Sequence, residues 1–203
     1  MSSAEPDVNQ VRFVTERFEE LKGLRSVAVG AAVSLVCGGF LAASEAARPP
    51  RAWEVQVVLV VALLPAGVAM YFVDRYYVRR FGRVRSRSLS PWADPLYWLI
   101  ILGMPLALRL ANGAAVVLSI WGIHWLRIVW RDWPHRAHHL LGVAAAALAV
   151  TVTCGADPSN LGSFQLWGLL IGAAGAILVG GLDHLMLARV MRSPVLEIRR
   201  RSG

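Results

Sequence analysis

The stretch SFQLWGLLIGAAGAILVGGL (residues 163–182) contains twenty residues and no charged side chain. An α-helix of about 20 residues is roughly 30 Å long, which matches the hydrocarbon thickness of a bilayer. All backbone hydrogen bonds of such a helix are internal, so it crosses lipid without exposing unpaired polar groups. The stretch therefore predicts a transmembrane helix.

The composition of the whole chain agrees with a membrane protein. Of its 203 residues, 56% are hydrophobic and 17% are charged, and the mean hydropathy is +0.52. Soluble domains have only about 45–50% apolar residues. Lys and Arg exceed Asp and Glu by 21 to 13, but no soluble domain remains to carry a basic face, which argues against a nucleic-acid partner. We expect an all-α, polytopic integral membrane protein.

Three further apolar runs predict crossings directly. They carry no Asp, Glu, Lys or Arg, and they are 26–44, 55–73 and 140–156. Each reaches the minimum of about 17 residues that a span needs. These runs give spans one, two and five, and 163–182 is span six.

Residues 95–130 are too long for a single crossing. Arg109, Asn112 and Gly113 are turn-compatible and divide the region into a third span at 95–108 and a fourth at 114–130. One span followed by a re-entrant segment is the alternative. With two spans the chain crosses the bilayer six times.

In the six-span arrangement the basic residues fall almost entirely on one side of the membrane. Of the 21 Lys and Arg residues, only Arg48, Arg51 and Arg109 lie on the other side. Cytoplasmic loops carry the Lys and Arg excess, so both termini are predicted to be cytoplasmic. Arg outnumbers Lys by 20 to 1, which indicates a GC-rich prokaryotic genome and hence a bacterial inner membrane.

Three regions follow from this topology. Residues 1–25 form a cytoplasmic tail with an amphipathic helix, 26–188 form the six-helix transmembrane domain, and 189–203 form a basic cytoplasmic tail. In the first region, Val11, Val14, Phe18 and Leu21 recur every three or four residues, which is the period of an amphipathic helix. We expect a lead-in helix lying in the lipid headgroups; a helix that binds a partner or the lipid surface is the alternative.

The longest polar connection, 75–94, contains six arginines. Such a segment either only fixes the topology or also holds anionic lipid headgroups. Anionic lipids at the basic cytoplasmic loops are therefore a predicted partner.

Small residues recur every four positions in spans one and six. The stripes are Gly30, Ser34 and Gly38 in span one, and Gly168, Gly172, Ala176 and Gly180 in span six. Small residues let helix backbones approach closely in lipid. We expect tight helix contacts here, either within the chain or between copies in an oligomer.

Ionisable residues gather at the predicted cytoplasmic mouth. The cluster consists of Asp74, His124, Arg127, Arg131, Asp183 and His184. Ionisable groups at membrane depth are costly and are therefore functional candidates. In span four, three of them follow i, i+3, i+7 spacing and share one face, for which Asp74 and Asp183 are the expected counter-charges. The alternative to a functional mouth is a salt-bridge network that fixes the helix ends.

The histidines allow two cofactor hypotheses. In Asp132-x-x-His135-x-x-His138-His139, a helix beginning near Pro134 would place His135 and His139 on one face, where they and Asp132 could bind a divalent metal. A b-type haem needs axial histidines from two helices, and His124 with either His184 or His139 is eligible. Neither group is firmly implied.

No complete catalytic motif occurs in the sequence: phosphate-loop, GxGxxG, GxSxG and EF-hand patterns are absent. The first hypothesis is a non-enzymatic subunit, scaffold or accessory protein of a membrane complex, partnered by another membrane protein or a second copy. The second is a small transporter or channel for a proton, ion or small solute, since Pro65 and Pro105 kink spans two and three. The third is a membrane metal or haem protein.

Overall fold

The computed structural model describes residues 8–18, 21–45, 51–81, 113–155 and 161–191. This part of the chain is all-helical and contains no strand. Its helices are α1 (Val8–Glu16), α2 (Leu24–Glu45), α3 (Ala52–Phe81), α5 (Gly113–Asp132), α6 (His139–Cys154) and α7 (Leu161–Met191). The all-α prediction is confirmed for these residues.

Among the described residues, three helices are long and apolar enough to cross a membrane: Leu24–Ala43, Gly113–Asp132 and Gly162–Met191. The helix His139–Cys154 is apolar but shorter. The predicted third span, 95–108, lies outside the described residues. The structure thus supports a membrane protein with three candidate spans, and the count of six stays a prediction.

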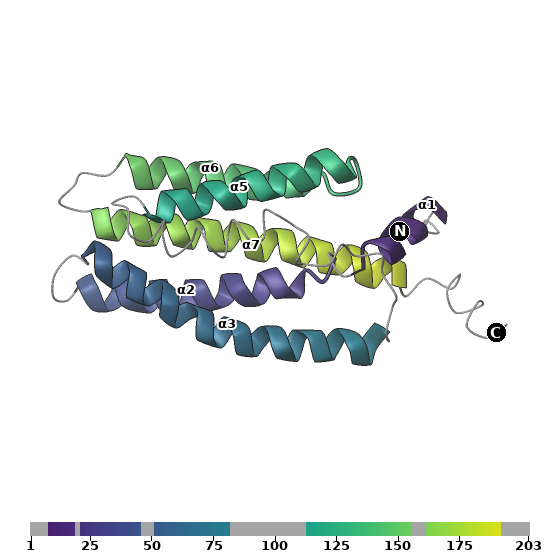
Figure 1. Cartoon of the computed structure of the whole chain (residues 1–203), viewed down its shortest axis with the longest axis horizontal. Coiled ribbons are helices and arrows are strands. Elements are labelled where there is room, and N and C mark those ends of the chain that lie inside the picture. The colour runs from purple at the N-terminus through teal and green to yellow at the C-terminus, as the bar shows by residue number, and fades with distance from the viewer. Residues whose placement is uncertain (1–7, 19–20, 46–50, 82–112, 156–160, 192–203) are drawn as a thin grey trace, which may run out of the picture.

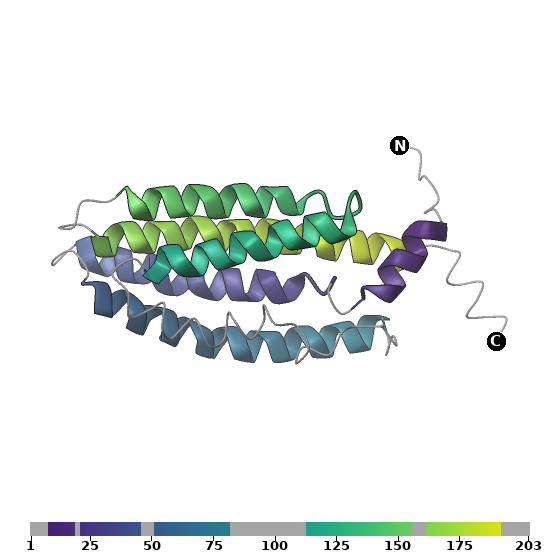
Figure 2. The same cartoon turned by 45° about the horizontal axis from the view of Figure 1, so that its top comes forward.

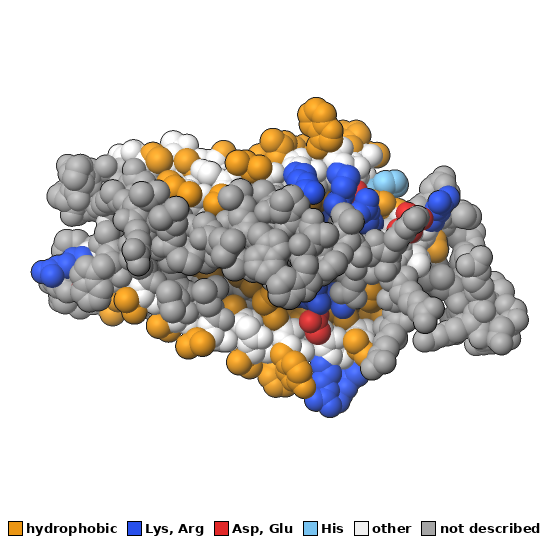
Figure 3. All heavy atoms as spheres, in the orientation of Figure 1, with side chains coloured by type: hydrophobic (Ala, Val, Ile, Leu, Met, Phe, Trp, Pro, Cys, Tyr) orange, Lys and Arg blue, Asp and Glu red, His pale blue; other side chains and the backbone are white. Residues whose placement is uncertain are grey.

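The five long helices run side by side, with α7 in the middle of the bundle (Figures 1 and 2). Helices α5 and α6 pack on one side of α7, and α2 packs on the other. Helix α3 lies mainly against α2. The short α1 lies at one end, which we call the α1 end. Figure 3 shows charged and histidine side chains gathered towards this end, with hydrophobic side chains along the flanks.

Small residues allow α7 to approach α2 closely. A Cβ atom added to Gly30 of α2 would meet the carbonyl oxygen of Ala173 and the side chain of Ile177. One added to Gly180 of α7 would meet the backbone of Gly23 and Val27. Any larger side chain at either glycine would force these backbones apart.

The two small-residue stripes do not face each other along their whole length. Gly168 and Gly172 of α7 face Leu118 of α5, and Gly168 also approaches Thr153 of α6. Gly38 of α2 has no described atom within 4 Å of the position that a Cβ would take. A repeat of four residues drifts around a helix with 3.6 residues per turn, so successive members of a stripe meet different neighbours.

The N-terminal amphipathic segment packs on the bundle. Val14, Phe18 and Leu21 are at most 2% exposed, and they form one hydrophobic cluster with Tyr77, Leu187 and Val190 from α3 and α7. The apolar face that the sequence predicts is therefore directed at the protein's own helix ends.

Candidate functional site

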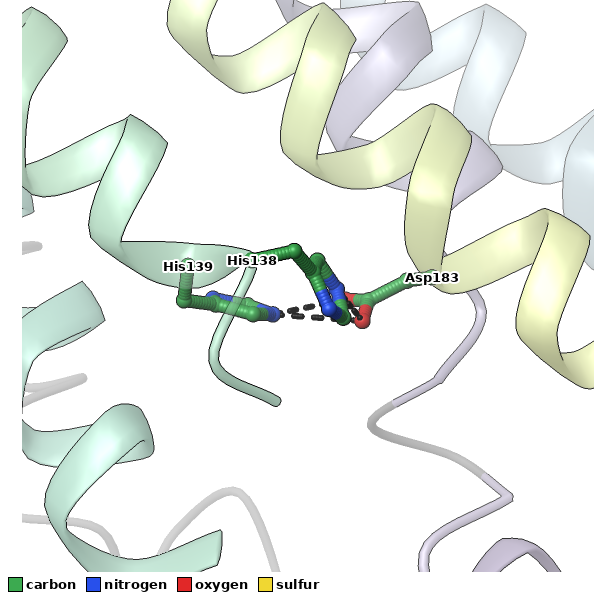
Figure 4. Close-up of side chains that lie close together, drawn as sticks. All are labelled: His138, His139 and Asp183. Atoms are coloured by element: carbon green, nitrogen blue, oxygen red, sulfur yellow. Dashed lines mark hydrogen bonds and ion pairs between the residues drawn. The ribbon is translucent and has the colours of Figure 1, made fainter. Parts of the chain in front are cut away.

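Asp183 of α7 is the centre of a buried polar cluster at the α1 end. Its carboxylate is 2.7 Å from Nη2 of Arg136 and 2.8 Å from Nε2 of His138. Nε2 of His139 lies 3.1 and 3.2 Å from its two oxygens. Figure 4 shows both imidazoles directed at the carboxylate, one from the turn before α6 and one from the first residue of α6.

A tight connection between α5 and α6 presents these groups together. Helix α5 ends at Asp132 and α6 begins at His139. In between, the backbone N–H of Arg136 donates to the carbonyl of Asp132 at 3.2 Å, and the N–H of His139 donates to the carbonyl of Arg136 at 3.0 Å. These bonds hold consecutive turns at the α5–α6 corner, so residues 136, 138 and 139 all reach α7.

Arg136 is 2% exposed, so its guanidinium depends on protein partners. Besides Asp183, it has Asp132 as a second carboxylate, with Nη1 3.6 Å from Oδ2. Both acids are also buried. A buried charge is stabilised only when such partners replace its lost hydration.

Asp132 extends the network to two more segments. The neighbouring Arg131 binds its two oxygens at 3.0 and 2.9 Å. Nη2 of Arg17, which directly follows α1, lies 3.6 Å from Oδ1. The network of charged groups therefore links the segment after α1, the end of α5, the α5–α6 turn and Asp183 within α7.

The ring of His139 has conflicting neighbours. Nε2 is 3.2 Å from Nε of Arg136, which can only donate, and 3.1 Å from a carboxylate oxygen of Asp183, which can only accept. One nitrogen cannot satisfy both contacts. Nδ1 is buried and has no hydrogen-bond partner among the described residues. His139 precedes the predicted span 140–156, and burial lowers the pKa of its ring, which favours the neutral form with a free lone pair.

Asp74 and His184, both predicted members of the mouth cluster, lie in separate contacts. Asp74 of α3 accepts from Nε of Arg25 at 2.7 Å, and Nζ of Lys22 lies 3.9 Å away. Nδ1 of His184 lies 2.9 Å from the hydroxyl of Tyr77, which also accepts from the N–H of Leu24 at 3.3 Å. Burial raises the pKa of Tyr77, which lies beyond the predicted span 55–73, to about 12.

The predicted polar face of α5 has other neighbours than expected. His124 is half-buried and Arg127 is exposed on α5, while Arg131 pairs with Asp132. Asp74 and Asp183, the expected counter-charges, bind Arg25 and Arg136. Asp74 and Asp183 thus pair with arginines that are not in the predicted mouth cluster.

The residues that come together as possible metal ligands differ from the predicted set. Residues 133–138 form turns, so the helix that would have aligned His135 with His139 begins only at His139. His135 is exposed and stacks on Phe13, with ring centroids 4.6 Å apart. The three groups that do converge are His138, His139 and Asp183, whose ligand atoms all lie within 4.8 Å of one another. Adjacent histidines before one span and an aspartate ending another were the only signal for this set.

The histidines proposed as haem ligands face different groups. His139 is directed at Asp183, and His184 lies beside Tyr77. The cluster around Asp183 has the chemistry of an ionic link between helices and also the donors of a small metal site.

Comparisons with protein-family models, curated proteins and solved structures find no match for this chain.

Proposed function

We propose that this chain is a non-enzymatic subunit or scaffold of a membrane complex. It crosses the cytoplasmic membrane of a prokaryote six times and has both termini in the cytoplasm. The basic loops at the cytoplasmic end contact anionic lipid headgroups, and another membrane protein or a second copy is the partner.

The observation that carries this proposal is that the acidic side chains at the α1 end form ion pairs with basic side chains of other segments. Asp74 joins α3 to Arg25 of α2, and Asp183 joins α7 to the α5–α6 turn. Asp132 adds the end of α1 through Arg17. These three carboxylates are paired with arginines from other segments and hold the helix ends together. This is the arrangement expected of a structural role.

The transporter hypothesis is less well supported by the same contacts. A transporter binds its solute near the middle of the membrane, at a site with polar groups available to it. The predicted mouth residues Asp74 and Asp183 are instead held by arginines at 2.6 and 2.7 Å. Each carboxylate would have to release its own arginine before it could bind an ion in that arginine's place.

The test is the mass of the assembly after extraction from its own membrane in mild detergent, measured by native mass spectrometry. We expect the chain at a fixed stoichiometry with a second polypeptide or with itself. A lone monomer would contradict the subunit role. Proteoliposomes of the purified chain provide the counter-test, because ion or proton flux above that of empty vesicles would favour a transporter.

A further inference from the structure

We propose that His138, His139 and Asp183 form a binding site for a divalent first-row transition-metal ion such as Zn²⁺, which replaces Arg136 as the partner of Asp183. This site goes beyond the proposed scaffold function and does not depend on it.

The donor geometry suits a small ion. Ligands about 2.0–2.2 Å from a tetrahedral Zn²⁺ lie roughly 3.3–3.6 Å from one another. Nε2 of His138 is 2.8 Å from one oxygen of Asp183, and Nε2 of His139 is 3.1 Å from the other. Nε2 of His139 also lies 3.2 Å from the oxygen that His138 contacts, and all three ligand atoms lie within 4.8 Å of one another. Shifts of about 1 Å would bring them to normal bond lengths around the ion.

The donor chemistry selects the class of metal. Two imidazole nitrogens and one carboxylate suit Zn²⁺ and its first-row neighbours, whereas Mg²⁺ and Ca²⁺ prefer all-oxygen sites. Three protein ligands leave a fourth position for water. His138 is the least buried of the three and lies on the turn before α6, so the ion has an approach from this side.

The contacts of His139 provide an independent reason for a ligand. Its Nε2 faces a donor, Nε of Arg136, and an acceptor, Asp183, and cannot satisfy both. With a metal bound, the lone pairs of Nε2 and of the carboxylate are both directed at the ion, and the conflict disappears.

Arg136 must move when the ion binds, because two positive charges would otherwise share Asp183. A second carboxylate is already at hand, since Oδ2 of Asp132 lies 3.6 Å from Nη1 of Arg136. The guanidinium can remain paired by shifting towards Asp132. Metal and Arg136 thus compete for one carboxylate.

The test uses the full-length, chelator-treated chain in detergent without a histidine tag. Zn²⁺ is titrated against a chromophoric chelator, and Co²⁺ is added separately to record its visible absorption. We expect one Zn²⁺ per chain and the intense bands of four-coordinate Co²⁺. The variants His138→Gln and His139→Gln should each weaken binding by at least about tenfold.

His135→Gln is the matched control, because His135 lies in the same turn but stacks on Phe13. It should bind Zn²⁺ like the wild type. Equal losses in all three histidine variants, or no binding by the wild type, would overturn the site.

A second pair of variants tests the competition, and its double variant removes both charges of the buried Arg136–Asp183 pair. Arg136→Gln should bind Zn²⁺ several-fold more tightly than the wild type, because the competing cation is gone. The double variant Arg136→Gln/Asp183→Asn should lose this binding. A double variant that binds as tightly as Arg136→Gln would show that Asp183 is not a ligand and would refute the proposal.

Discussion

Arg136 is the residue on which the charge balance of the α1 end depends. Its guanidinium is buried and lies between Asp183 and Asp132. Removing one partner of a buried ion pair leaves the other charge without solvent or counter-charge. Removing Arg136 alone is therefore expected to destabilise the fold more than removing both partners of the pair.

Arg136→Met should lower the free energy of unfolding by about 3–5 kcal/mol. The measurement is the unfolding midpoint in detergent, followed by circular dichroism. Arg12→Met is the control, because the Arg12–Glu16 pair is mostly exposed and such pairs contribute about 0–1 kcal/mol. Equal effects of the two substitutions would show that the buried network contributes nothing special.

Tyr77 should titrate far above an ordinary tyrosine. Burial raises its pKa from 10.0 to about 12, so its neutral form is stabilised in the folded chain. This contribution is complete below pH 10 and is lost as the pH rises from 10 to about 12, because the unfolded chain ionises first. The difference in tyrosinate absorbance between wild type and Tyr77→Phe should appear near pH 12. A difference centred at pH 10 would contradict a buried hydroxyl.

The candidate site could be predicted only in part from single residues. Asp183 and His139 are recognisable because ionisable groups beside apolar runs are unusual. Arg136 and His138 are not, since their contacts with Asp183 span 47 and 45 residues and depend on the turn at 133–138. The start of α6 at His139 decides which histidines converge, and helix boundaries are the least predictable feature of a sequence.

At the level of elements, two glycines of α2 differ in the space around them for an added methyl group. Gly30→Ala should destabilise the bundle by about 1–3 kcal/mol, because the added methyl group meets the backbone of α7. Gly38→Ala should be neutral or stabilise by up to about 1 kcal/mol, since alanine favours the helix and no described atom is near. Thermal unfolding in detergent measures both. Destabilisation by Gly38→Ala would instead reveal an intermolecular contact on that face.

Helix α3 presents aromatic and basic side chains on one outer surface. A shallow groove is lined by Phe72, Arg75, Tyr76, Arg79 and Arg80. In the proposed topology α3 forms span two, so its last turns would lie at headgroup depth, where arginines attract anionic lipids by about 1 kcal/mol each. The aromatic rings can lie along the first part of an acyl chain.

Replacing Arg75, Arg79 and Arg80 by Gln should reduce retention of phosphatidylglycerol at least several-fold. The measurement is lipid co-purification from vesicles of mixed phosphatidylglycerol and phosphatidylcholine, followed by native mass spectrometry. Arg51→Gln is the control, because Arg51 precedes the opposite end of α3. Unchanged lipid retention in the triple variant would leave topology as the only role of these arginines.

The apolar elements were predictable from the sequence, and their partners were not. Helices α2 and α7 contain the whole of the predicted runs 26–44 and 163–182, and α6 covers most of 140–156. Such runs are recognisable because a span needs a minimum apolar length. The apolar face of α1 was also recognisable from its period. Its burial against Tyr77 and Leu187 was not, since periodicity identifies a face and not what covers it.

For the whole molecule, the described ion pairs between different helices gather at the α1 end of the bundle. Arg25 at the start of α2 pairs with Asp74 in the last third of α3, and Arg136 of the α5–α6 turn lies between Asp132 of α5 and Asp183 of α7. These groups lie at the α1 end. Helices that alternate in direction bring every second connection to the same end. A basic excess at that end would hold it in the cytoplasm.

The six-span topology predicts alternating locations for reporters fused along the chain. Alkaline phosphatase should be active after Arg48, Ala111 and Pro158 and inactive after Arg87, Arg136 and Gly203, because it folds only outside the cytoplasm. Green fluorescent protein at the same positions is the control and should show the opposite pattern. The fusions after Ala111 and Arg136 together decide residues 95–130, since activity after Ala111 and none after Arg136 requires two full crossings in this region. Phosphatase activity after Gly203 would mean an odd number of crossings, which would contradict the packing of the N-terminal segment against Leu187 and Val190 at the end of α7.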